Sequence, residues 1–258
     1  MTQTLLKLEG IESSYGAVKA VRGVSLQVQS GEICSILGSN GAGKTTVLKT
    51  VSGILDPEKG SVQFNGKEIS GQDPATIVQM GLLHVPEGRE VFPHLSVYDN
   101  LSMGAFTRRD RAEVGNDIEE VFGYFPILRQ RSRIAAGLLS GGQQQMLALS
   151  RAIVARPKMI LLDEPSLGLS PKLTQEIFEI VVQINRKHGT AFLVVEQNAN
   201  MALNVADYSY ILENGRLVTE GASSGLRQRK DIQSFYLGVQ DPERRTQPTT
   251  RSLGAEWR

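Results

Sequence analysis

Residues 38–45, GSNGAGKT, match the pattern G-x-x-x-x-G-K-[ST] at every specified position. Backbone N–H groups of such a loop surround phosphates, Lys44 neutralises charge on the β- and γ-phosphates, and the Thr45 hydroxyl binds Mg²⁺. An apolar, strand-like run precedes the loop and a helical pattern follows it, which is the context that the pattern requires. The sequence therefore predicts a nucleoside triphosphate site. Its expected nucleotide-binding residues are Gly38, Ser39, Asn40, Gly41, Ala42, Gly43, Lys44, Thr45 and Thr46.

An acidic pair, Asp163 and Glu164, ends the apolar run MILLDEP at residues 159–165. The carboxyl ends of parallel strands meet at one edge of a sheet, so both carboxylates are expected beside the phosphate loop. There Asp163 would hold Mg²⁺, and Glu164 would polarise the attacking water as a general base. Alone, such a pair more often marks a strand that ends at a solvated turn. Together with a complete phosphate loop, it indicates nucleotide hydrolysis.

A second anion-binding element is indicated by LLSGGQQQ at residues 138–145. Ser140 has the residue type of a helix N-cap, and Gly141 and Gly142 allow backbone N–H groups to approach another molecule closely. Helix N-termini of this kind attract anions. A simple kinase or GTPase needs the phosphate loop but not this second element. An ordinary helix start is the alternative, and it leaves the two glycines unexplained.

Strands and helices alternate along most of the chain, which predicts an α/β fold with a mostly parallel sheet. Asn65-Gly66 and Asn214-Gly215 indicate hairpins, and therefore antiparallel elements beside the parallel core. Strands are expected at residues 24–28, 33–37, 82–86, 159–162 and 191–195, and a helix is expected at 171–187.

The hydrophobic pattern changes from strand-like to helical at Ser96 and stays helical to residue 155. The change begins with Ser-x-x-Asp, a helix start that resembles a capping box. This segment is expected to form an inserted helical subdomain. The polar, pattern-free C-terminus is expected to be a mobile tail. The predicted division is a nucleotide-binding core at 1–87 and 156–238, a helical subdomain with LLSGGQQQ at 88–155, and the tail at 239–258.

The composition and charge of the chain disfavour a membrane-spanning or nucleic-acid-binding protein. A chain of 258 residues with 40% hydrophobic and 21% charged residues is typical of a soluble globular protein. The net charge of +1 supplies no basic field, so no nucleic-acid partner is expected. No apolar run reaches the roughly 20 residues that cross a bilayer, so any membrane contact is expected through a partner. His84, His94 and His188 are expected to be structural, since they lack metal-site or catalytic spacing. Cys34 lies in the apolar run ICSIL and is expected to be a small buried hydrophobic residue.

The motif LSGGQ at residues 139–143, between the phosphate loop and the strand ending in Asp-Glu-Pro, resembles the signature of the ABC ATPases. The resemblance extends to about Gly238. It implies a P-loop NTPase (RecA-like) fold with ATP and Mg²⁺ as cofactors. It also implies a head-to-tail pair of ATPase chains, in which each signature closes over the ATP held by the other chain. The residues implied to act in trans are Ser140, Gly141, Gly142 and Gln143.

Four further positions match or depart from the family pattern. Tyr15 resembles the aromatic residue that stacks on adenine, although it could equally be a surface or core tyrosine. Glu87 stands where most members have a glutamine that senses Mg²⁺ and the γ-phosphate. Gln197 stands where most members have a histidine, and it is implied to act beside Glu164 in catalysis. Ser170 replaces an aspartate in the segment that usually contacts the partner chain, which weakens that contact.

VPEGR-x-VFP, DEPSLGL-x-P, VEQNA and LENG together resemble the LivF-like ATPases of branched-chain amino acid importers. That resemblance implies a peripheral protein on the cytoplasmic face of the cell membrane, which hydrolyses ATP to energise uptake. Its implied partners are a second, different ABC ATPase subunit, transmembrane permease subunits and, indirectly, an extracytoplasmic solute-binding protein. The surface near Arg89 and Phe92 is implied to receive a membrane subunit, with internal packing of Phe92 as the alternative.

Three other functions stay open from the sequence. The departures at Glu87, Ser170 and Gln197 suit an ATP-gated clamp with little turnover of its own, whereas intact Lys44 and Glu164 argue against complete inactivity. Importers of urea or amides use similar ATPases. A nucleic-acid-acting ABC protein is disfavoured, because the chain has neither a long coiled coil nor a second cassette nor a strong basic patch.

Overall fold

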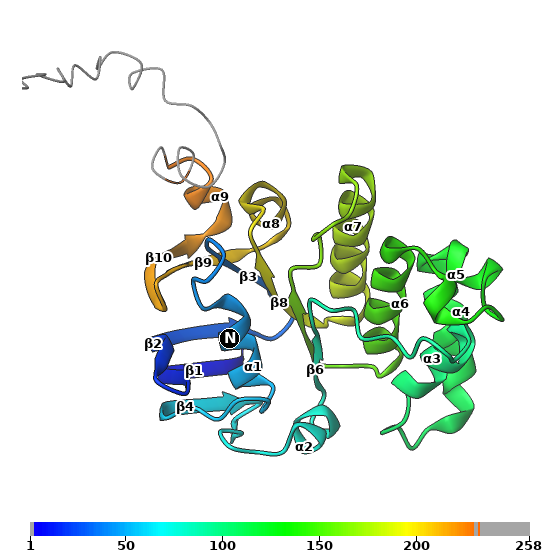
Figure 1. Ribbon diagram of the computed structural model, residues 1–258, viewed down its shortest axis with the longest axis horizontal. Coiled ribbons are helices and arrows are strands. Elements are labelled where there is room, and N and C mark those ends of the chain that lie inside the picture. Colours follow the sequence, from blue (N-terminus) through cyan, green and yellow to red (C-terminus); the bar gives the residue numbers. More distant parts are fainter. Residues whose placement is uncertain (1–2, 230–231, 233–258) are drawn as a thin grey trace, which may run out of the picture.

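A mostly parallel sheet forms the centre of the fold (Figure 1). Its strands are β3 (Ile33–Leu37), β6 (Leu82–Val85), β7 (Met159–Asp163), β8 (Ala191–Glu196), β9 (Tyr208–Glu213) and β10 (Arg216–Ala222). The computed structural model describes residues 3–229 and 232, and within them the strand order is β10-β9-β3-β8-β7-β6. Only β10 pairs antiparallel in this described sheet. Every residue of β3, β7 and β8 is buried, which explains their continuous apolar sequences.

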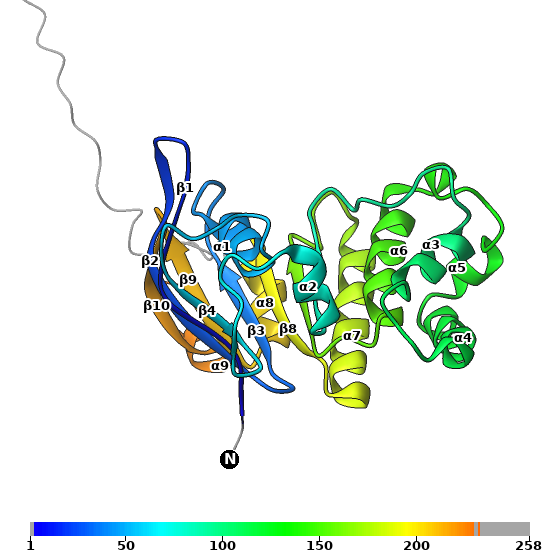
Figure 2. The ribbon, with the colours of Figure 1, turned by 90° about the horizontal axis from the view of Figure 1, so that it is seen from below.

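An antiparallel sheet covers one face of the parallel sheet (Figure 2). It consists of β1 (Thr4–Tyr15), β2 (Val18–Gln29), β4 (Lys59–Phe64) and β5 (Lys67–Glu68), in the order β2-β1-β4-β5. The helix α1 (Lys44–Val51) lies between the two sheets, and α2 (Pro74–Gln79) precedes β6. One apolar cluster joins Val28 of β2, Leu48 of α1 and Leu161 of β7. The start of α1, where the phosphate loop lies, is therefore anchored by the core.

Helices cover the opposite face and extend to one end of the molecule (Figures 1 and 2). They are α3 (Val97–Gly104), η1 (Arg111–Glu113), α4 (Val114–Tyr124), α5 (Pro126–Gln130), η2 (Ala136–Leu138), α6 (Gly141–Val154) and α7 (Pro171–His188). A second apolar cluster runs from Ile160 of β7 through Leu147 of α6 to Phe122 of α4. Ile160 and Leu161 belong to different clusters because successive strand side chains point to opposite faces. The helical end therefore shares its core with the sheet.

Two short helices, α8 (Ala199–Val205) and α9 (Ser223–Leu226), complete the described fold. They pack with Leu37 and Ile211 in a third apolar cluster near the ends of β3 and β9. This cluster covers the part of the sheet next to the phosphate loop.

Most of the predicted elements are confirmed. The turns at Asn65-Gly66 and Asn214-Gly215 have positive φ at both residues, as expected for hairpins. The helix predicted at 171–187 is α7, and Ser96 caps α3 by accepting a hydrogen bond from the Asp99 N–H. The segment 96–155 is helical but broken into several helices. The long strand β1 carried no prediction, and residues 239–258, the predicted tail, lie outside the described residues.

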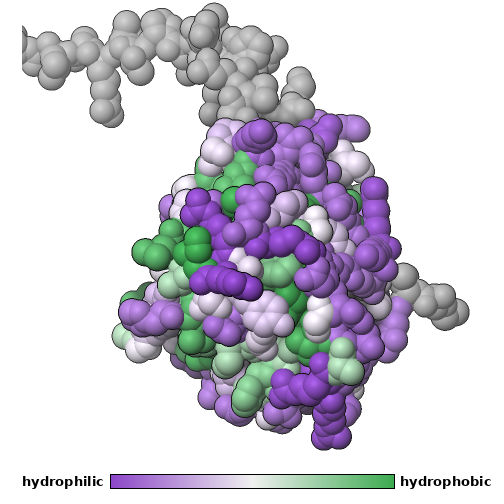
Figure 3. Space-filling view, turned by 90° about the vertical axis from the view of Figure 1, so that its right-hand side faces the viewer, coloured by the Kyte–Doolittle hydropathy of each residue, from purple (hydrophilic) through white to green (hydrophobic). Residues whose placement is uncertain are grey.

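The surface of the helical end is mixed. Figure 3 shows apolar patches among polar side chains on this face. The large exposed apolar residues of the helical segment and the loops around it are Phe92, Leu95, Tyr98, Met103, Phe106, Ile134 and Leu138. In the part of the chain that the structure describes, no helix combines the length and the apolar character needed to span a membrane.

Candidate functional site

The phosphate loop joins β3 to α1 and bends sharply at Gly43, the N-cap of the helix. Gly43 has φ of 103°, and a Cβ atom there would lie 2.6 Å from the Ala20 carbonyl oxygen. Only glycine fits that combination of left-handed backbone and close contact. The bend places the first N–H groups of α1 at a cavity of about 430 Å³. Its lining includes Asn40, Gly41, Lys44, Thr45, Thr46, Glu87 and Glu164.

Lys44 is 5% exposed, and its ammonium group is fully engaged by its own chain. Nζ donates to the carbonyl oxygens of Gly38 at 2.9 Å and Ser39 at 3.2 Å, and it lies 3.0 Å from Glu164 Oε1. The structure thus brings the lysine and the acidic pair together, as the sequence led us to expect. Phosphate oxygens entering the cavity would compete with Glu164 for this ammonium group.

Thr45 and Asp163 form the second contact between the phosphate loop and β7. Thr45 Oγ1 donates to Asp163 Oδ1 at 3.0 Å. Asp163 is 2% exposed, and its burial raises the pKa of its carboxyl group to about 6, with the charges of Glu87 and Glu164 adding to the rise. A bound cation would offset this crowding of negative charge.

These residues fit a magnesium site of the type found with nucleotides. A hydroxyl and a carboxylate oxygen are ligands that Mg²⁺ accepts, and it usually takes the rest from phosphates and water. Consistent with that division, residues 3–229 hold no group of three or more His, Cys, Asp or Glu side chains able to bind a metal without the nucleotide. Thr45 and Asp163 would hold the ion, and Glu87 lines the same cavity.

Glu164 has a strained backbone conformation. Its φ is 48°, in the left-handed region that non-glycine residues seldom adopt, and its N–H donates to the Val195 carbonyl at 2.9 Å. Backbone strain of this kind costs of order 1–3 kcal/mol and often occurs where a side chain must be aimed at a reaction. Here the bend turns Glu164 from the end of β7 toward Lys44.

Several predicted residues are not among those that line the phosphate cavity, namely Tyr15, Gly38, Ser39, Ala42, Asp163 and Gln197. Gly38, Ser39 and Ala42 belong to the phosphate loop itself, and Asp163 is hydrogen-bonded to Thr45, whereas Tyr15 and Gln197 lie further away in the chain. Tyr15 is 47% exposed, and the Lys49 ammonium lies 5.9 Å from its ring centroid. The exposed ring leaves its face available to another flat group. Gln197 is exposed at the start of the loop between β8 and α8. Contacts of either residue with a nucleotide stay predictions.

The signature segment begins α6 with a complete capping box. The Ser140 hydroxyl accepts from the Gln143 N–H, and the Gln143 side chain accepts from the Ser140 N–H. A Cβ atom on Gly141 would lie 2.5 Å from Arg89 Nη1, and one on Gly142 would lie 2.1 Å from Leu173 Cδ2. Both glycines therefore pack closely against side chains of their own chain, a contact that the sequence did not reveal. None of the signature residues lines the phosphate cavity of the same chain.

Arg89 and Glu90 form the bend between β6 and the helical end, and both have positive φ. Arg151 of α6 donates from Nη1 to the Glu90 carbonyl at 2.6 Å, and its guanidinium lies 4.7 Å from the Phe92 ring centroid. Phe92 is thus partly packed within the chain, yet it stays 41% exposed. Beside it lies a groove of about 320 Å³. The groove is lined by His84, Arg89, Met103, Phe106 and Arg151, among others.

The sequence profile of the ABC transporter family matches residues 21–167, more than half of the chain. The chain belongs to the ABC transporter family. It is 44% identical to the high-affinity branched-chain amino acid transport ATP-binding protein BraG of Pseudomonas aeruginosa, over 91% of this chain and 100% of that protein.

Two further relatives support the assignment. The probable branched-chain amino acid transport ATP-binding protein LivF of Archaeoglobus fulgidus is 32% identical, over 92% of this chain and 100% of its own length. A crystal structure of an ATP-binding cassette of an ABC transporter in its ADP conformation has a TM-score of 0.76 and 29% identity, covering 92% of this chain and 100% of that one. The chain is therefore an ABC ATPase with a P-loop NTPase (RecA-like) fold, as predicted.

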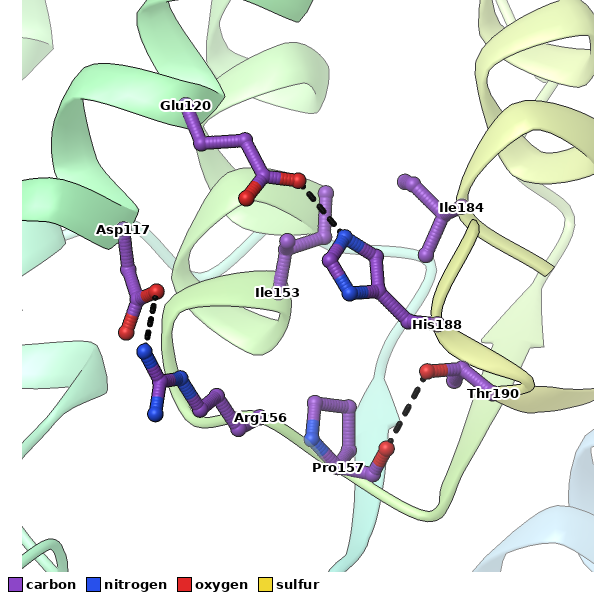
Figure 4. Close-up of a pocket in the computed structure, with 8 residues that line it drawn as sticks. All are labelled: Asp117, Glu120, Ile153, Arg156, Pro157, Ile184, His188 and Thr190. Atoms are coloured by element: carbon purple, nitrogen blue, oxygen red, sulfur yellow. Dashed lines mark hydrogen bonds and ion pairs between the residues drawn. The ribbon is translucent and has the colours of Figure 1, made fainter. Parts of the chain in front are cut away.

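A second cavity of the ABC cassette, of about 320 Å³, separates the ends of α4, α6 and α7 (Figure 4). Across it, His188 Nε2 lies 2.6 Å from Glu120 Oε1, and Arg156 donates to Asp117 at 2.9 Å. Burial opposes ionisation of Glu120, but hydrogen bonds from Tyr124, His188 and Lys187 outweigh it and lower its pKa to about 2. These paired charges tie the helical end to α7, so His188 has the structural role expected from the sequence.

We expect His84 to make the stability of the cassette depend on pH. The ring is largely buried, its Nδ1 lies 3.3 Å from Ser52 Oγ, and burial lowers its pKa from 6.5 to about 4. As the pH falls, the His84 ring is protonated in the unfolded chain before it is protonated in the folded one. The free energy of unfolding is therefore unaffected by this ring above pH 6.5 and decreases between pH 6.5 and 4. The largest expected loss is about 3 kcal/mol.

Urea unfolding of the wild type and of His84→Asn, compared at several pH values from 7.5 to 4.5, measures this dependence. The difference in unfolding free energy between the two proteins should shrink as the pH falls. His94→Asn, which alters an exposed ring, is the matched control. A difference for His84→Asn that stays constant over this pH range would contradict the prediction.

Proposed function

We propose that this ABC cassette hydrolyses ATP to drive the import of branched-chain amino acids through partner membrane subunits. The observation that carries the reaction is the meeting of Lys44, Thr45 and Glu164 at one phosphate cavity, with Asp163 hydrogen-bonded to Thr45. The substrate class is supported by the 44% identity to BraG over its full length. Urea or amide import is the alternative that a transport assay must separate.

In the proposed mechanism, residues 38–46 bind the phosphates of ATP. The Lys44 ammonium group leaves its ion pair with Glu164 and binds the β- and γ-phosphate oxygens instead. Thr45, Asp163 and Glu87 would hold Mg²⁺, which neutralises charge that develops on the phosphates. Glu164, once released from Lys44, takes a proton from the attacking water. The water oxygen bonds to the γ-phosphorus, the bond to the bridging oxygen breaks, and ADP and phosphate leave.

A second ATPase chain would complete the site. We propose that Ser140, Gly141, Gly142 and Gln143 bind the γ-phosphate held by that partner, and that the partner's signature closes over this chain's cavity. The support is that α6 begins with an ordered capping box outside the chain's own phosphate cavity. Helix N-termini offer free N–H groups to anions.

The groove beside Arg89 and Phe92 is the proposed contact with the transmembrane permease subunits. It lies next to the bend that carries Glu87, so a movement of the partner would reach the phosphate cavity through a short segment. We propose accordingly that the cassette acts as a peripheral protein at the cytoplasmic face of the membrane. An extracytoplasmic solute-binding protein would act only indirectly.

Reconstitution tests the function. The chain would be co-purified with its membrane subunits and second ATPase, placed in liposomes with the associated solute-binding protein, and supplied with MgATP. Leucine, isoleucine and valine should accumulate in an ATP-dependent manner, while urea and acetamide should not. Accumulation of urea alone would show that urea, and not branched-chain amino acids, is the substrate. If none of these solutes accumulates in an ATP-dependent manner, the proposal is refuted.

An ATP-gated clamp is the second candidate, and three residues favour it. Glu87 would place a negative charge near the γ-phosphate, Gln197 is not ionisable, and Ser170 serves as the N-cap of α7 by accepting from the Leu173 N–H. In such a clamp, ATP binding would hold the two chains together while the partner performs most of the turnover.

A further inference from the structure

Glu196, the last residue of β8, is a buried acid that the mechanism above does not use. It is 0% exposed, and Gln197 follows it directly. Within residues 3–229 it forms no ion pair, so its carboxylate is held by uncharged donors alone. Burial raises its pKa, hydrogen bonds from Ser166 lower it, and the nearby charge of Glu164 raises it further. Such a group is costly to bury and needs a reason.

The contacts of Glu196 link two loops of the candidate site. Its Oε1 accepts from the Ser166 N–H at 3.0 Å, and its Oε2 accepts from the Ser166 hydroxyl at 2.9 Å. Ser166 lies two residues after Glu164. Oε2 also lies 3.3 Å from the N–H of Asn198, whose side chain caps α8. One carboxylate therefore joins the loop after Glu164 to the loop that begins with Gln197.

A carboxylate suits this position better than an amide. It offers only acceptors and receives three hydrogen bonds at once. A glutamine would keep one acceptor oxygen for the Ser166 N–H and turn its amide toward the hydroxyl, leaving the Asn198 N–H unpaired. The adjoining backbone bond from Glu164 N–H to the Val195 carbonyl, at 2.9 Å, fixes the same loop from its other end.

We propose that Glu196 is a positioning residue for ATP hydrolysis. It holds the Ser166 loop against the end of β8, and this keeps the strained Glu164 backbone in the conformation that directs its carboxylate into the phosphate cavity. The same carboxylate holds the start of the loop that carries Gln197. The loops of Glu164 and Gln197, which would lie on either side of the reacting phosphate, therefore keep a fixed position relative to each other. This inference rests on the proposed hydrolytic function of the cassette.

The test is steady-state ATPase kinetics of the assembled complex carrying Glu196→Gln, Glu196→Ala, Ser166→Ala or the Glu196→Ala/Ser166→Ala pair. Glu196→Ala should lower kcat about ten- to a hundredfold, with KM for ATP changed less than about twofold, because misplacement affects the reaction and not phosphate binding. Glu196→Gln should recover part of kcat. The double variant should lose no more than Glu196→Ala, since both changes break one connection.

Ser150→Ala is the matched control, because the Ser150 hydroxyl is buried without a hydrogen-bond partner in the described structure. It should keep the wild-type kcat. If Glu196→Ala does not fold, Ser166→Ala removes the hydroxyl bond to Glu196 Oε2 and keeps the N–H bond to Oε1, so it must still lower kcat, by less than Glu196→Ala. A kcat that depends on Glu164 but not on Glu196 or Ser166 would overturn this inference only. A kcat independent of Glu164 would overturn the hydrolytic function itself.

Discussion

Replacing Glu164 with glutamine in this chain alone is expected to lower the ATPase turnover of the assembled complex by about 10²- to 10⁴-fold. Glutamine cannot accept the proton of the attacking water. ATP binding should persist and strengthen, because Lys44 loses a carboxylate partner that lies 3.0 Å from its Nζ. The cavity also loses a negative charge that repels phosphates. Phosphate release and equilibrium binding of MgATP measure the two effects separately.

This experiment also separates the two candidate functions. A collapse of turnover supports the hydrolase, whereas unchanged turnover with tight ATP binding would leave only the clamp. Glu58→Gln is the control, since it removes the same charge from an exposed side chain between α1 and β4 and should change neither quantity. Weaker ATP binding by Glu164→Gln would contradict the competition between Glu164 and the phosphates.

Replacing Lys44 with methionine is expected to weaken ATP binding at least about a hundredfold. Hydrogen bonds to charged groups contribute about 1.5–3 kcal/mol each, and the ammonium group would bind oxygens of both the β- and γ-phosphates. Methionine keeps most of the side-chain volume in a position that is 5% exposed. The variant also leaves Glu164 without its cation, so the cavity becomes more negative. Titration calorimetry with MgATP measures the loss.

Lys67→Met serves as the matched control, because Lys67 is exposed on β5 and away from the phosphate loop. Its affinity for MgATP should equal that of the wild type. Thermal unfolding of both variants shows whether the fold is intact, since Lys44 also donates to the carbonyl oxygens of Gly38 and Ser39. A folded Lys44→Met protein with wild-type affinity would remove Lys44 from the proposed site.

Features that depend on neighbours along the chain were predictable from the sequence. The phosphate loop, the hairpin turns at Asn65 and Asn214, and the N-caps at Ser96 and Ser140 are each built from a few consecutive residues with restricted backbone conformations. The buried strands were equally clear, because a strand covered on both faces has an apolar run such as ICSIL at β3. The family resemblance rests on the same local motifs and is confirmed by the comparisons.

Features that depend on contacts between distant residues emerged only from the fold. The sequence placed Glu164 near Lys44 but did not show that they are ion-paired, or that Glu164 has a left-handed backbone. Gly141 and Gly142 suggested phosphate binding, and only the fold showed that they also pack closely against the side chains of Arg89 and Leu173. The role proposed for Glu196 could not be predicted from the sequence, because it depends on hydrogen bonds with Ser166, which lies 30 residues away along the chain.

The physical reason is that pattern and propensity describe a residue's own segment, whereas hydrogen bonds of buried groups are satisfied by whichever segment the tertiary fold brings close. β1 shows the same limit: its pairing with β2 and β4 stabilises a sequence that has no clean alternation of its own. The amino-acid sequence therefore specified the nucleotide chemistry and the family. The tertiary structure decided that Glu164 is directed at the phosphate cavity and paired with Lys44, and that Glu196 is held by Ser166, because these contacts join segments from different strands of the sheet.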